Sequence, residues 1–353
     1  MIAAAFAIPG ALDLPTGGYA YDRAVLSRFP MDGLSLAHLA LPAGFPAPSE
    51  AQVREALAAL AATAPQTLLL IDGLALGALP AEGLAALDRR IVALIHHPFS
   101  LEAGLSAEER ARLAASERAA LARCVHVVAT SPATGRTLIR DFGVDPARLT
   151  IAPPGSAPVA RAPADGSPAR LLAVGSLIPR KGYDVLIAAL GQLKSFAWSL
   201  TIIGSLDLHP ATAAQVRALI AAHGLDARIT LAGARPAEDL AQAFAGCDLF
   251  VHPSLYEGYG MVLAEAMRHG LPMICTTGGA ANETVPDRAA LKVPPGDAES
   301  LAGALRICLL SPKERRRLAD AAFAAGQKLP GWDDTAHLIA GALVRAAALE
   351  TLP

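Results

Sequence analysis

Residues 249–270 read LFVHPSLYEGYGMVLAEAMRHG, which joins a short apolar run, a turn with two glycines and an amphipathic segment. The apolar run predicts a buried strand that ends at Pro253, and a helical period begins near Gly260. Comparable units of strand, turn and helix recur along the chain. Such alternation favours parallel sheets with helices on both faces, so we expect an α/β protein.

Twelve apolar runs predict strands, six on each side of a break at 153–169, where PPGSAPVARAPADGSPA has neither the helical nor the strand period. The predicted strands are Ile2–Ile8, Leu34–Leu41, Thr67–Asp72, Ile91–His97, His126–Ser131, Leu149–Ala152, Leu171–Gly175, Leu200–Gly204, Ile229–Ala232, Leu249–Pro253, Pro272–Thr276 and Ala290–Val293. Helices are expected at 49–62, 106–123, 183–194, 210–223, 236–245, 260–269, 297–310 and 332–349. The pattern predicts two doubly wound domains at 1–155 and 170–330, a linker at 156–169, and a last helix in 331–353 that packs back on the first domain.

Composition excludes several classes of protein. Of the 353 residues 53% are hydrophobic and 18% charged, with a formal net charge of −2, which disfavours a disordered chain and a nucleic-acid partner. The four cysteines are scattered, without metal-ligand or disulfide spacing, which indicates a reducing compartment. The apolar start is too short to span a bilayer and reads as a buried strand. We expect a cytoplasmic protein with at most peripheral contact at the inner membrane face.

The turn ahead of Gly260 carries the chemistry. A helix that begins there directs free backbone N–H groups and its positive dipole end toward a ligand, which suits a phosphate. Glu257 lies just before the helix and Glu265 eight residues later. Carboxylates accept hydrogen bonds from vicinal hydroxyls, so the pair suits a nucleotide sugar. The structural alternative is that Glu257 caps the helix and Glu265 is solvated.

The stretch Glu257-Gly258-Tyr259-Gly260-(x)4-Glu265-Ala266, followed by Gly270-Leu271-Pro272, Gly278-Gly279 and Glu283, resembles the Glu-(x)7-Glu signature of glycosyltransferase family 4. These are retaining enzymes of GT-B fold, in which two Rossmann-like domains face a central cleft. The resemblance implies that Glu265 holds the ribose hydroxyls of the donor and Glu257 the ring hydroxyls of its sugar.

Residues 174–186, VGSLIPRKGYDVL, are similar to the first donor-domain loop of that family, where a lysine before glycine meets the diphosphate. Lys181 takes that role here by resemblance. The chain departs from the commoner family pattern at Ser176, where many members have arginine, and the sequence leaves open whether Arg180 compensates. Arg180 and Lys181 as a solvated surface pair is the alternative.

Two segments of the first domain also resemble family motifs. Gly17 and Gly18 follow the first strand and resemble the amino-terminal glycine loop, although a tight turn explains them equally well. His96 and His97 end a strand, and by resemblance one of them is catalytic, near the transferred sugar. Neighbours on a strand point to opposite sides, so the sequence does not decide which one; both could also be structural.

The resulting hypothesis is a retaining, metal-independent transfer of a hexose from a nucleotide diphosphate sugar to an acceptor hydroxyl, in glycan, glycolipid or polysaccharide biosynthesis. The acceptor could be a sugar, a lipid-linked molecule or a small metabolite. No Asp-x-Asp or histidine cluster has metal-ligand spacing, so we expect neither metal nor cofactor. The alternatives are a nucleotide-sugar-binding protein without turnover and a nucleotide-sugar epimerase on the same fold. Further residues assigned to the donor are Gly175, Ser176, Arg180, Gly204, Thr230, Leu231, Gly258, Tyr259, Gly260, Met261 and Val262.

Overall fold

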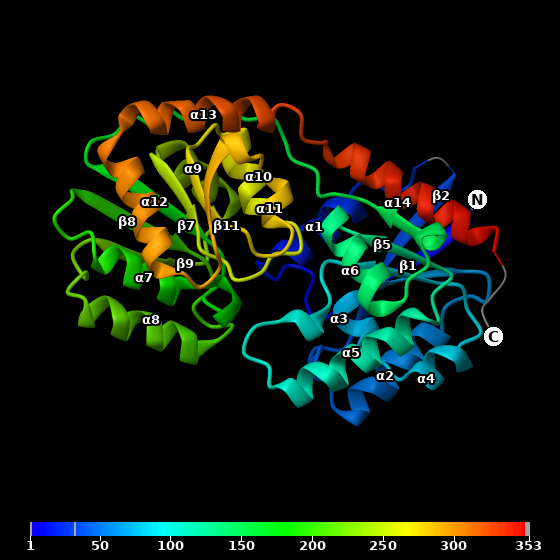
Figure 1. Cartoon of the computed structure of the whole chain (residues 1–353). Helices are drawn as coiled ribbons and strands as arrows, with labels where there is room; N and C mark the ends of the chain where they lie inside the picture. Colours follow the sequence, from blue (N-terminus) through cyan, green and yellow to red (C-terminus); the bar gives the residue numbers. More distant parts are fainter. Residues whose placement is uncertain (1, 32, 350–353) are drawn as a thin grey trace. The chain divides into compact units, whose positions relative to one another are not determined.

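The computed structural model describes residues 2–31 and 33–349 and divides into two compact units (Figure 1). Unit 1 contains the described residues of Met1–Gly155 and Pro330–Pro353, and unit 2 is Ser156–Leu329. The last helix therefore belongs to unit 1. Residues 350–353 of the expected final segment lie outside the described residues.

Unit 1 is built on a six-stranded sheet with the order β2-β1-β3-β4-β5-β6, in which neighbouring strands are parallel. The strands are β1 (Ile2–Pro9), β2 (Leu34–Leu41), β3 (Leu68–Asp72), β4 (Ile91–Ile95), β5 (His126–Ala129) and β6 (Leu149–Ile151). The helices are α1 (Gly17–Leu26), α2 (Glu50–Ala61), α3 (Gly73–Leu76), α4 (Ala81–Ala86), α5 (Ala107–Leu121), α6 (Pro132–Phe142) and α14 (Trp332–Ala347), with short 3-10 helices η1 (Phe99–Leu101) and η2 (Pro146–Arg148).

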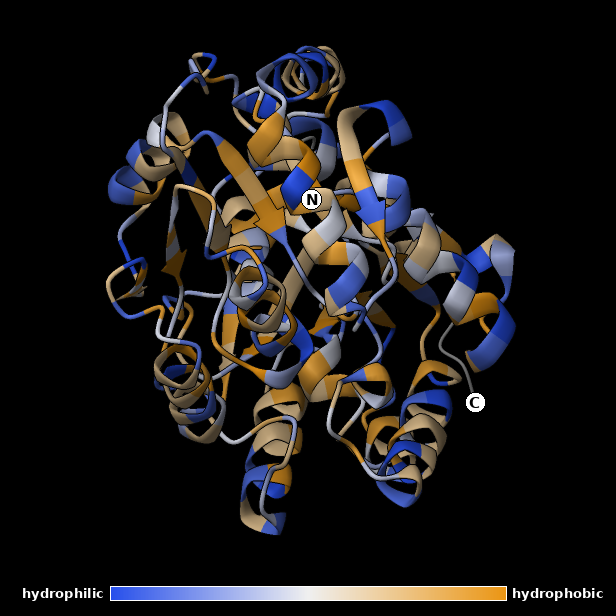
Figure 2. Ribbon diagram, turned by 60° about the vertical axis from the view of Figure 1, so that its left-hand side comes forward, coloured by the Kyte–Doolittle hydropathy of each residue, from blue (hydrophilic) through white to orange (hydrophobic). Residues whose placement is uncertain are grey.

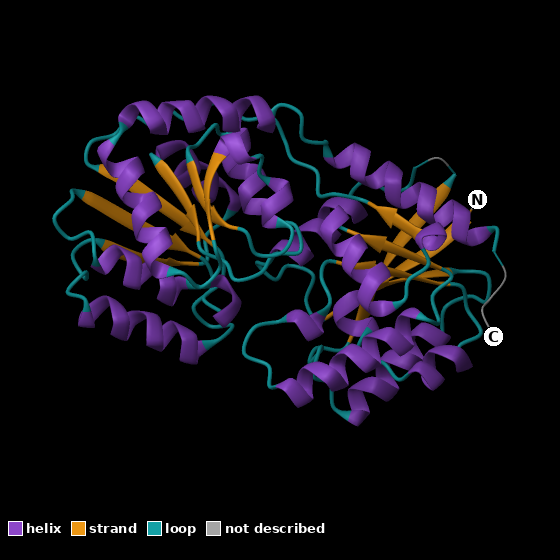
Figure 3. Ribbon diagram, viewed as in Figure 1, coloured by secondary structure: helices purple, strands orange, loops and turns teal. Residues whose placement is uncertain are grey.

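Both faces of this sheet are covered by helices (Figure 3). Side chains alternate along each strand, and one set, including Ile71, Ala93 and Val127, packs in a core with α2, α4, α5 and α6. On the other face α14 contacts β1, β3, β5 and β6 as well as α1. Because these strands are buried on both faces, they read as continuous apolar runs, which Figure 2 shows as hydrophobic arrows.

Unit 2 has a second six-stranded sheet, with the order β12-β11-β10-β7-β8-β9 and parallel neighbours. Its strands are β7 (Ala169–Val174), β8 (Trp198–Ile203), β9 (Ile229–Gly233), β10 (Leu249–His252), β11 (Met273–Thr276) and β12 (Ala290–Val293). Its helices are α7 (Tyr183–Gly191), α8 (Pro210–Ala222), α9 (Ala237–Gly246), α10 (Met261–Arg268), α11 (Ala281–Thr284), α12 (Ala298–Leu310) and α13 (Pro312–Gly326), with 3-10 helices η3 (Pro179–Lys181) and η4 (Asp287–Ala289).

Two cores lie on the two faces of the unit 2 sheet. Leu171 points to a core formed with α7, α8 and α12, whereas its neighbour Leu172 points to a core formed with α9, α10 and α13. This arrangement, with strands in the order of a dinucleotide-binding sheet, is a doubly wound Rossmann-like fold. The predicted fold class is confirmed for both units.

All twelve predicted strands are present, with ends within two residues of the prediction. The helices expected at 106–123 and 49–62 are also present, and each starts with a capping box, formed by Ser106 with Glu109 and by Ser49 with Gln52. Helix α13 was not predicted, because its first turns are mostly charged and its apolar period is weak. Its start is nevertheless encoded locally, since Ser311 caps it and Pro312 is its first residue.

The segment 156–168, which we call the linking segment, has no helix or strand and is hydrogen-bonded along unit 2. The Ser156 hydroxyl accepts from Arg268 Nε at 2.8 Å, and the Ala162 N–H donates to the His269 carbonyl at 2.8 Å. The Gly166 N–H donates to the buried Asp248 carboxylate at 2.8 Å. These contacts hold the linking segment to its own unit.

Candidate functional site

The strand order of unit 2 reverses between β7 and β10, which are neighbours in the sheet. Parallel sheets of this kind bind ligands beyond the carboxyl ends of the strands at such a switch point. The two sequence motifs follow these two strands: residues 175–182 come after β7 and residues 253–260 after β10. The topology therefore brings together two segments that are more than seventy residues apart in the chain.

Close packing of the two segments depends on Gly182. This residue has a φ of +63°, and a Cβ there would lie 2.3 Å from the Pro253 carbonyl oxygen, so no side chain fits. Next to it the Leu255 N–H donates to the Arg180 carbonyl at 2.7 Å. Arg180 and Lys181 lie in η3 rather than in an open loop, and α7 starts at Tyr183, as predicted.

Four donors converge on one oxygen of Glu257, which is 6% exposed. Lys181 Nζ lies 2.6 Å from Oε1 and Ser254 Oγ 2.7 Å from the same atom. His252 Nε2 lies at 2.9 Å, and it must donate because an ionised carboxylate only accepts. Arg180 lies 3.4 Å away and also donates to the Tyr256 carbonyl. Lys181, Arg180 and Glu257 are thus brought together, which removes the alternative of a solvated surface pair.

The electrostatics of this cluster favour an anionic ligand. Burial alone would raise the pKa of Glu257, but the charges of Lys181 and Arg180 and the His252 hydrogen bond outweigh it and hold that pKa well below the usual value. Burial lowers the pKa of His252, so its imidazole is neutral. Two cations face one carboxylate, and the group has a net charge of +1. A phosphate group bound beside the cluster would offset this positive charge.

Helix α10 supplies the second half of the site. Gly260 caps it with a φ of +88°, and the N–H groups of Met261 and Val262 are in the first turn, which lacks intrahelical acceptors. Glu265 lies one turn further on. Its Oε2 atom is buried and has no hydrogen-bond partner among the described residues, and burial raises the pKa of Glu265 to about 7. An unsatisfied buried carboxylate oxygen is costly unless a ligand donates to it.

The backbone between Glu257 and α10 is held by its neighbours. The Glu257 carbonyl accepts from the Ala280 N–H at 2.8 Å, and the Tyr259 carbonyl accepts from the Thr284 hydroxyl at 2.6 Å. Burial raises the pKa of Tyr259 to about 12, so its phenol stays neutral. Gly258 lies between these two anchored residues. The turn is therefore fixed before any ligand arrives.

The other predicted donor residues of unit 2 divide into two groups. Gly175, Ser176 and Gly204 lie together at the ends of β7 and β8, and a Cβ on Gly204 would be 2.0 Å from the Gly175 carbonyl oxygen. Thr230 and Leu231 lie on the edge strand β9, and β7 and β8 separate them from β10. The structure does not bring these two side chains into the Glu257 cluster.

In unit 1 the glycine motif is helical, which corrects one prediction. Gly17 and Gly18 are the first two residues of α1, after the cap residue Thr16, and they are not a loop ahead of the helix. Gly18 lies against His96: a Cβ there would be 3.3 Å from Cδ2 and 3.4 Å from Nε2 of the imidazole. The helix start and the histidine are therefore in contact.

The two adjacent histidines have different surroundings. β4 ends at Ile95, and the His96 imidazole lies with Asp22 of α1 and Asp72 at the end of β3. His97 Nε2 lies 3.2 Å from Glu102 Oε2, and its side chain lines a small cavity with Glu117 and apolar residues of α5 and α6. The structure thus separates two residues that the sequence could not distinguish.

Sequence reasoning missed four residues of these clusters. His252 and Ser254 were not among the predicted site residues, yet both side chains contact Glu257. Asp22 and Asp72 were also missed. His252 and Ser254 lie within the quoted stretch, just before Glu257, so proximity was an available signal, whereas nothing local connects Asp22 with Asp72.

The part of the chain that the structure describes contains one group with the spacing of metal ligands. The side-chain atoms of Asp22, Asp72 and His96 lie within 4.8 Å of one another. His96 Nε2 already faces Asp22 Oδ1 at 3.2 Å and Asp72 Oδ2 at 3.4 Å, and these hydrogen bonds explain the spacing without an ion. The Glu257 cluster brings two cations to its carboxylate, an arrangement that disfavours a metal there.

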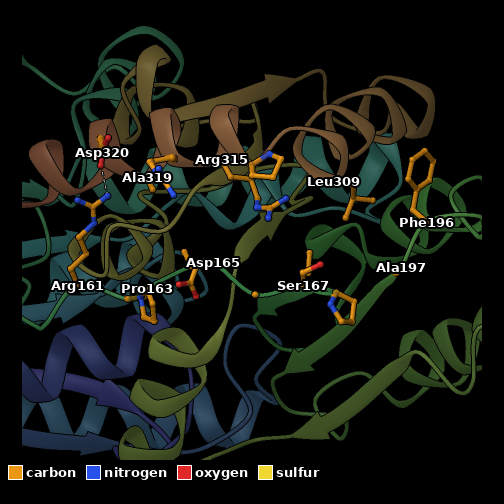
Figure 4. Close-up of a pocket in the computed structure, with 17 residues that line it drawn as sticks. Arg161, Pro163, Asp165, Ser167, Phe196, Ala197, Leu309, Arg315, Ala319 and Asp320 are labelled. Atoms are coloured by element: carbon orange, nitrogen blue, oxygen red, sulfur yellow. Dashed lines mark hydrogen bonds and ion pairs between the residues drawn. The ribbon is translucent and has the colours of Figure 1, made fainter.

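A cavity of about 720 Å³ in unit 2 lies away from this site (Figure 4). Its lining includes Arg161, which pairs with Asp320, and Arg315 of α13. Ala169 begins β7 and Ala197 directly precedes β8, so the cavity lies at the amino ends of the strands. Lys181 and Glu257 lie at the opposite, carboxyl ends, and the donor is not assigned to this cavity.

Comparison with known proteins decides the family. The family model described as "Glycosyl transferases group 1" matches residues 160–324, and the model described as "Glycosyltransferase Family 4" matches residues 43–157. The chain belongs to glycosyltransferase family 4. The first match contains both the Lys181 and the Glu257 segments, and the second contains both histidines.

Among curated family relatives, an MMP alpha-(1->4)-mannosyltransferase of Mycolicibacterium hassiacum is 30% identical over 215 residues, 60% of this chain and 51% of that protein. A D-inositol 3-phosphate glycosyltransferase of Kineococcus radiotolerans is 28% identical over 293 residues, which is 72% of this chain and 66% of that protein. The chain thus spans about half to two thirds of the length of these relatives.

Solved structures share the fold of this family member. Anabaena Alr3699/HepE in complex with UDP-glucose has a TM-score of 0.80 at 20% identity, covering 98% of this chain and 100% of that chain. The sucrose-phosphate synthase from Thermosynechococcus elongatus has a TM-score of 0.77 at 23% identity, covering 97% and 98%. The chain has the GT-B fold.

Within residues 2–31 and 33–349 every helix is too short or too polar to cross a bilayer.

Proposed function

We propose that the protein is a retaining, metal-independent glycosyltransferase that moves a hexose from a nucleotide diphosphate sugar to an acceptor hydroxyl. One observation carries the proposal: the buried Oε2 of Glu265, which has no hydrogen-bond partner among the described residues, lies on the helix whose N-terminus follows the cationic Glu257 cluster. A ligand that carries hydroxyls on both sides of a diphosphate satisfies both groups at once. Relatives solved with UDP or UDP-glucose support this donor class.

Each residue of unit 2 has a role that follows from its contacts. Glu265 accepts hydrogen bonds from the ribose hydroxyls, which satisfies its buried oxygen. Oε1 of Glu257 is occupied by four donors, so Oε2 is the atom that a hydroxyl of the transferred sugar reaches. The first-turn N–H groups of Met261 and Val262 bind a phosphate.

Lys181 and Arg180 stabilise the leaving group. As the glycosidic bond breaks, the electron pair stays on the diphosphate oxygen, and preorganised cations and N–H groups beside it lower the barrier. In this proposal Arg180, which lies 3.4 Å from Glu257 Oε1, compensates for Ser176. The departing phosphate accepts the proton of the acceptor hydroxyl, so the reaction needs no separate general base and proceeds with retention.

His96 is the proposed catalytic group of unit 1. The proposed acceptor is a sugar, a lipid-linked molecule or a small metabolite. The proposed location is the cytoplasm, with at most peripheral contact with a membrane. The proposed pathway is glycan, glycolipid or polysaccharide synthesis. The names of the similar mannosyltransferase and D-inositol 3-phosphate glycosyltransferase support a sugar-transfer reaction.

The test is thermal unfolding of the purified full chain in EDTA, with UDP, GDP, ADP and their hexose conjugates. A ligand at about a hundred times its dissociation constant stabilises the folded state by about 2.7 kcal/mol, which raises the midpoint by a few degrees. The wild type should respond to one nucleotide class, and Lys181→Met should respond at least about tenfold more weakly. The exposed Lys194→Met is the matched control and should respond like the wild type.

Turnover completes the test. The donor found by binding should release free nucleotide in EDTA when an acceptor is supplied, and the anomeric configuration of the product, read by proton NMR, should equal that of the donor. Binding without release would indicate a protein that has lost turnover. A requirement for added metal, or an inverted product, would refute the mechanism.

A further inference from the structure

Unit 1 contains a buried charged cluster that the donor site does not use. His96 Nε2 lies 3.2 Å from Asp22 Oδ1 and 3.4 Å from Asp72 Oδ2. The side chains of Asp22 and Asp72 are 2% and 3% exposed, whereas that of His96 is 21% exposed. The imidazole is therefore the member of the cluster that a ligand can reach.

The position of the cluster in the fold indicates a function. The strand order of unit 1 reverses between β1 and β3, and Asp72 ends β3 while α1, which carries Asp22, follows β1. His96 follows β4, the next strand in the sheet. The three residues thus lie at the carboxyl edge beside the switch point, where parallel sheets place their ligands.

Two buried carboxylates beside one imidazole are expensive without a compensating positive charge. The guanidinium of the neighbouring Arg23 is directed to the carbonyl oxygens of Leu12 and Leu14. Asp72 Oδ1 is engaged by the Leu74 N–H at 2.8 Å, which leaves Oδ2 for the histidine. Both carboxylates therefore use the same partner, the Nε2–H of His96.

The remaining surroundings hold the ring in one orientation. The rings of Tyr21 and His96 pack in a T-shaped arrangement, with centroids 5.2 Å apart and an interplanar angle of 84°. Thr130 Oγ1 donates to the His96 carbonyl at 3.1 Å, and Gly18 leaves the space that the ring occupies. The Tyr21 hydroxyl donates to the Ala152 carbonyl, so the packing residue is itself anchored.

We propose that Asp22 and Asp72 are positioning residues that hold the His96 imidazole by its Nε2, keep a proton on that nitrogen, and present the ring for the sugar-transfer reaction. This inference rests on the proposed function for its catalytic consequence but not for its geometry. Two acceptors at one nitrogen favour the form of the ring that carries a proton on Nε2, and they fix the plane of the ring. In catalytic and metal-binding histidines, an acceptor at the other ring nitrogen has the same effect.

The charges that face the imidazole support this arrangement. Burial alone would lower the pKa of His96, but Asp22 and Asp72 raise it to about 10. Burial raises the pKa of Asp22 to about 6. The His96 imidazole acts to lower this pKa, and the charge of Asp72 adds a smaller rise. From α1, Tyr19 also faces the carboxylates, and its pKa is raised to about 12, so it adds no charge.

The test is side-chain NMR of the ¹⁵N-labelled full chain, in which long-range proton–nitrogen correlations report the state of each of the nine histidines. The signals lost in His96→Gln assign the ring. In the wild type, Nε2 should show the shift of a protonated nitrogen from pH 6 to pH 9. The isosteric variants Asp22→Asn and Asp72→Asn should each lower the apparent pKa of His96 by at least one pH unit.

Glu102→Gln is the matched control, because it removes the carboxylate partner of the adjacent His97 and should leave the His96 signals unchanged. An unprotonated Nε2 in the wild type, or a His96 pKa unaffected by both Asp variants, would overturn the proposal. The wild-type measurement stands even where a variant fails to fold. One equivalent of Zn²⁺ or Mn²⁺ should leave the wild-type signals in place; their stoichiometric loss would show a metal site instead.

Turnover separates this inference from the proposed function. With the donor found by thermal shift, Asp22→Asn should lower kcat at least about tenfold, while the nucleotide still stabilises the variant like the wild type. Unchanged kcat with an altered His96 spectrum would overturn the catalytic part. A wild type that binds no nucleotide would refute the proposed function and leave the NMR result to decide the geometry.

Discussion

The buried carboxyl group of Glu265 makes the stability of unit 2 depend on pH in a way that one substitution should remove. Its Oε2 has no partner among the described residues, and burial raises its pKa from 4.5 to about 7. Because the folded-state pKa exceeds the unfolded one, the folded state keeps a proton that the unfolded chain has lost. The contribution of Glu265 to stability is therefore fully present below pH 4.5 and is lost as the pH rises through about 7.

The magnitude follows from the two pKa values. A pKa difference of about 2.5 is worth about 3 kcal/mol, which is the upper limit of the cost that the ionised carboxylate adds at pH 8.5. Glu265→Gln replaces the group with a neutral amide of the same shape. The variant should match the wild type at pH 5 within about 0.5 kcal/mol, and should be more stable by about 2 to 3 kcal/mol at pH 8.5.

Urea unfolding followed by tryptophan fluorescence measures this effect. Trp198 lies in unit 2 and Trp332 in unit 1, and the chain has no other tryptophan, so a Trp332→Phe background reports on unit 2 alone. The exposed Glu238→Gln is the control and should change stability at neither pH. A Glu265→Gln effect that is the same at both pH values, or a loss of stability at pH 8.5, would refute the reasoning. The same variant should bind the nucleotide more weakly, because a diol donates better to a carboxylate than to an amide.

Three further predictions follow from single contacts. Gly18→Ala places a methyl group 3.3 Å from the His96 ring and should reduce turnover at least about tenfold with little change in melting midpoint, whereas Gly303→Ala, with open space around it, should leave turnover unchanged. Burial and two nearby arginines lower the pKa of His126 to about 4, so unfolding takes up a proton below pH 6.5; the melting midpoint of unit 1 should fall between pH 6.5 and 4, and less so in His126→Gln. Asp248→Ala removes the acceptor that anchors the linking segment, so unit 2 should lose about 2 to 3 kcal/mol and limited proteolysis should cut that segment faster; unchanged cleavage would contradict the assigned contact.

Much of the fold could be predicted from local patterns because their causes are local. Continuous apolar runs mark strands buried on both faces, and Ser106 with Glu109 marks a helix start, because the capping hydrogen bonds span only three residues. Gly260 at the end of the Glu257 turn marks a backbone conformation that L-residues rarely adopt. Helix α13 escaped prediction because its charged first turns weaken the apolar period.

The sequence by itself determined the fold class, the two motifs that follow β7 and β10, and the residue types of the candidate site. The tertiary structure decided which side chains share an atom: that Lys181, Arg180, His252 and Ser254 meet on one oxygen of Glu257, and that His96 rather than His97 lies with Asp22 and Asp72. Periodicity and turn chemistry act over a few residues, whereas these contacts join segments that only strand order and helix packing bring together. Burial there also shifts each pKa by an amount that depends on every neighbour at once.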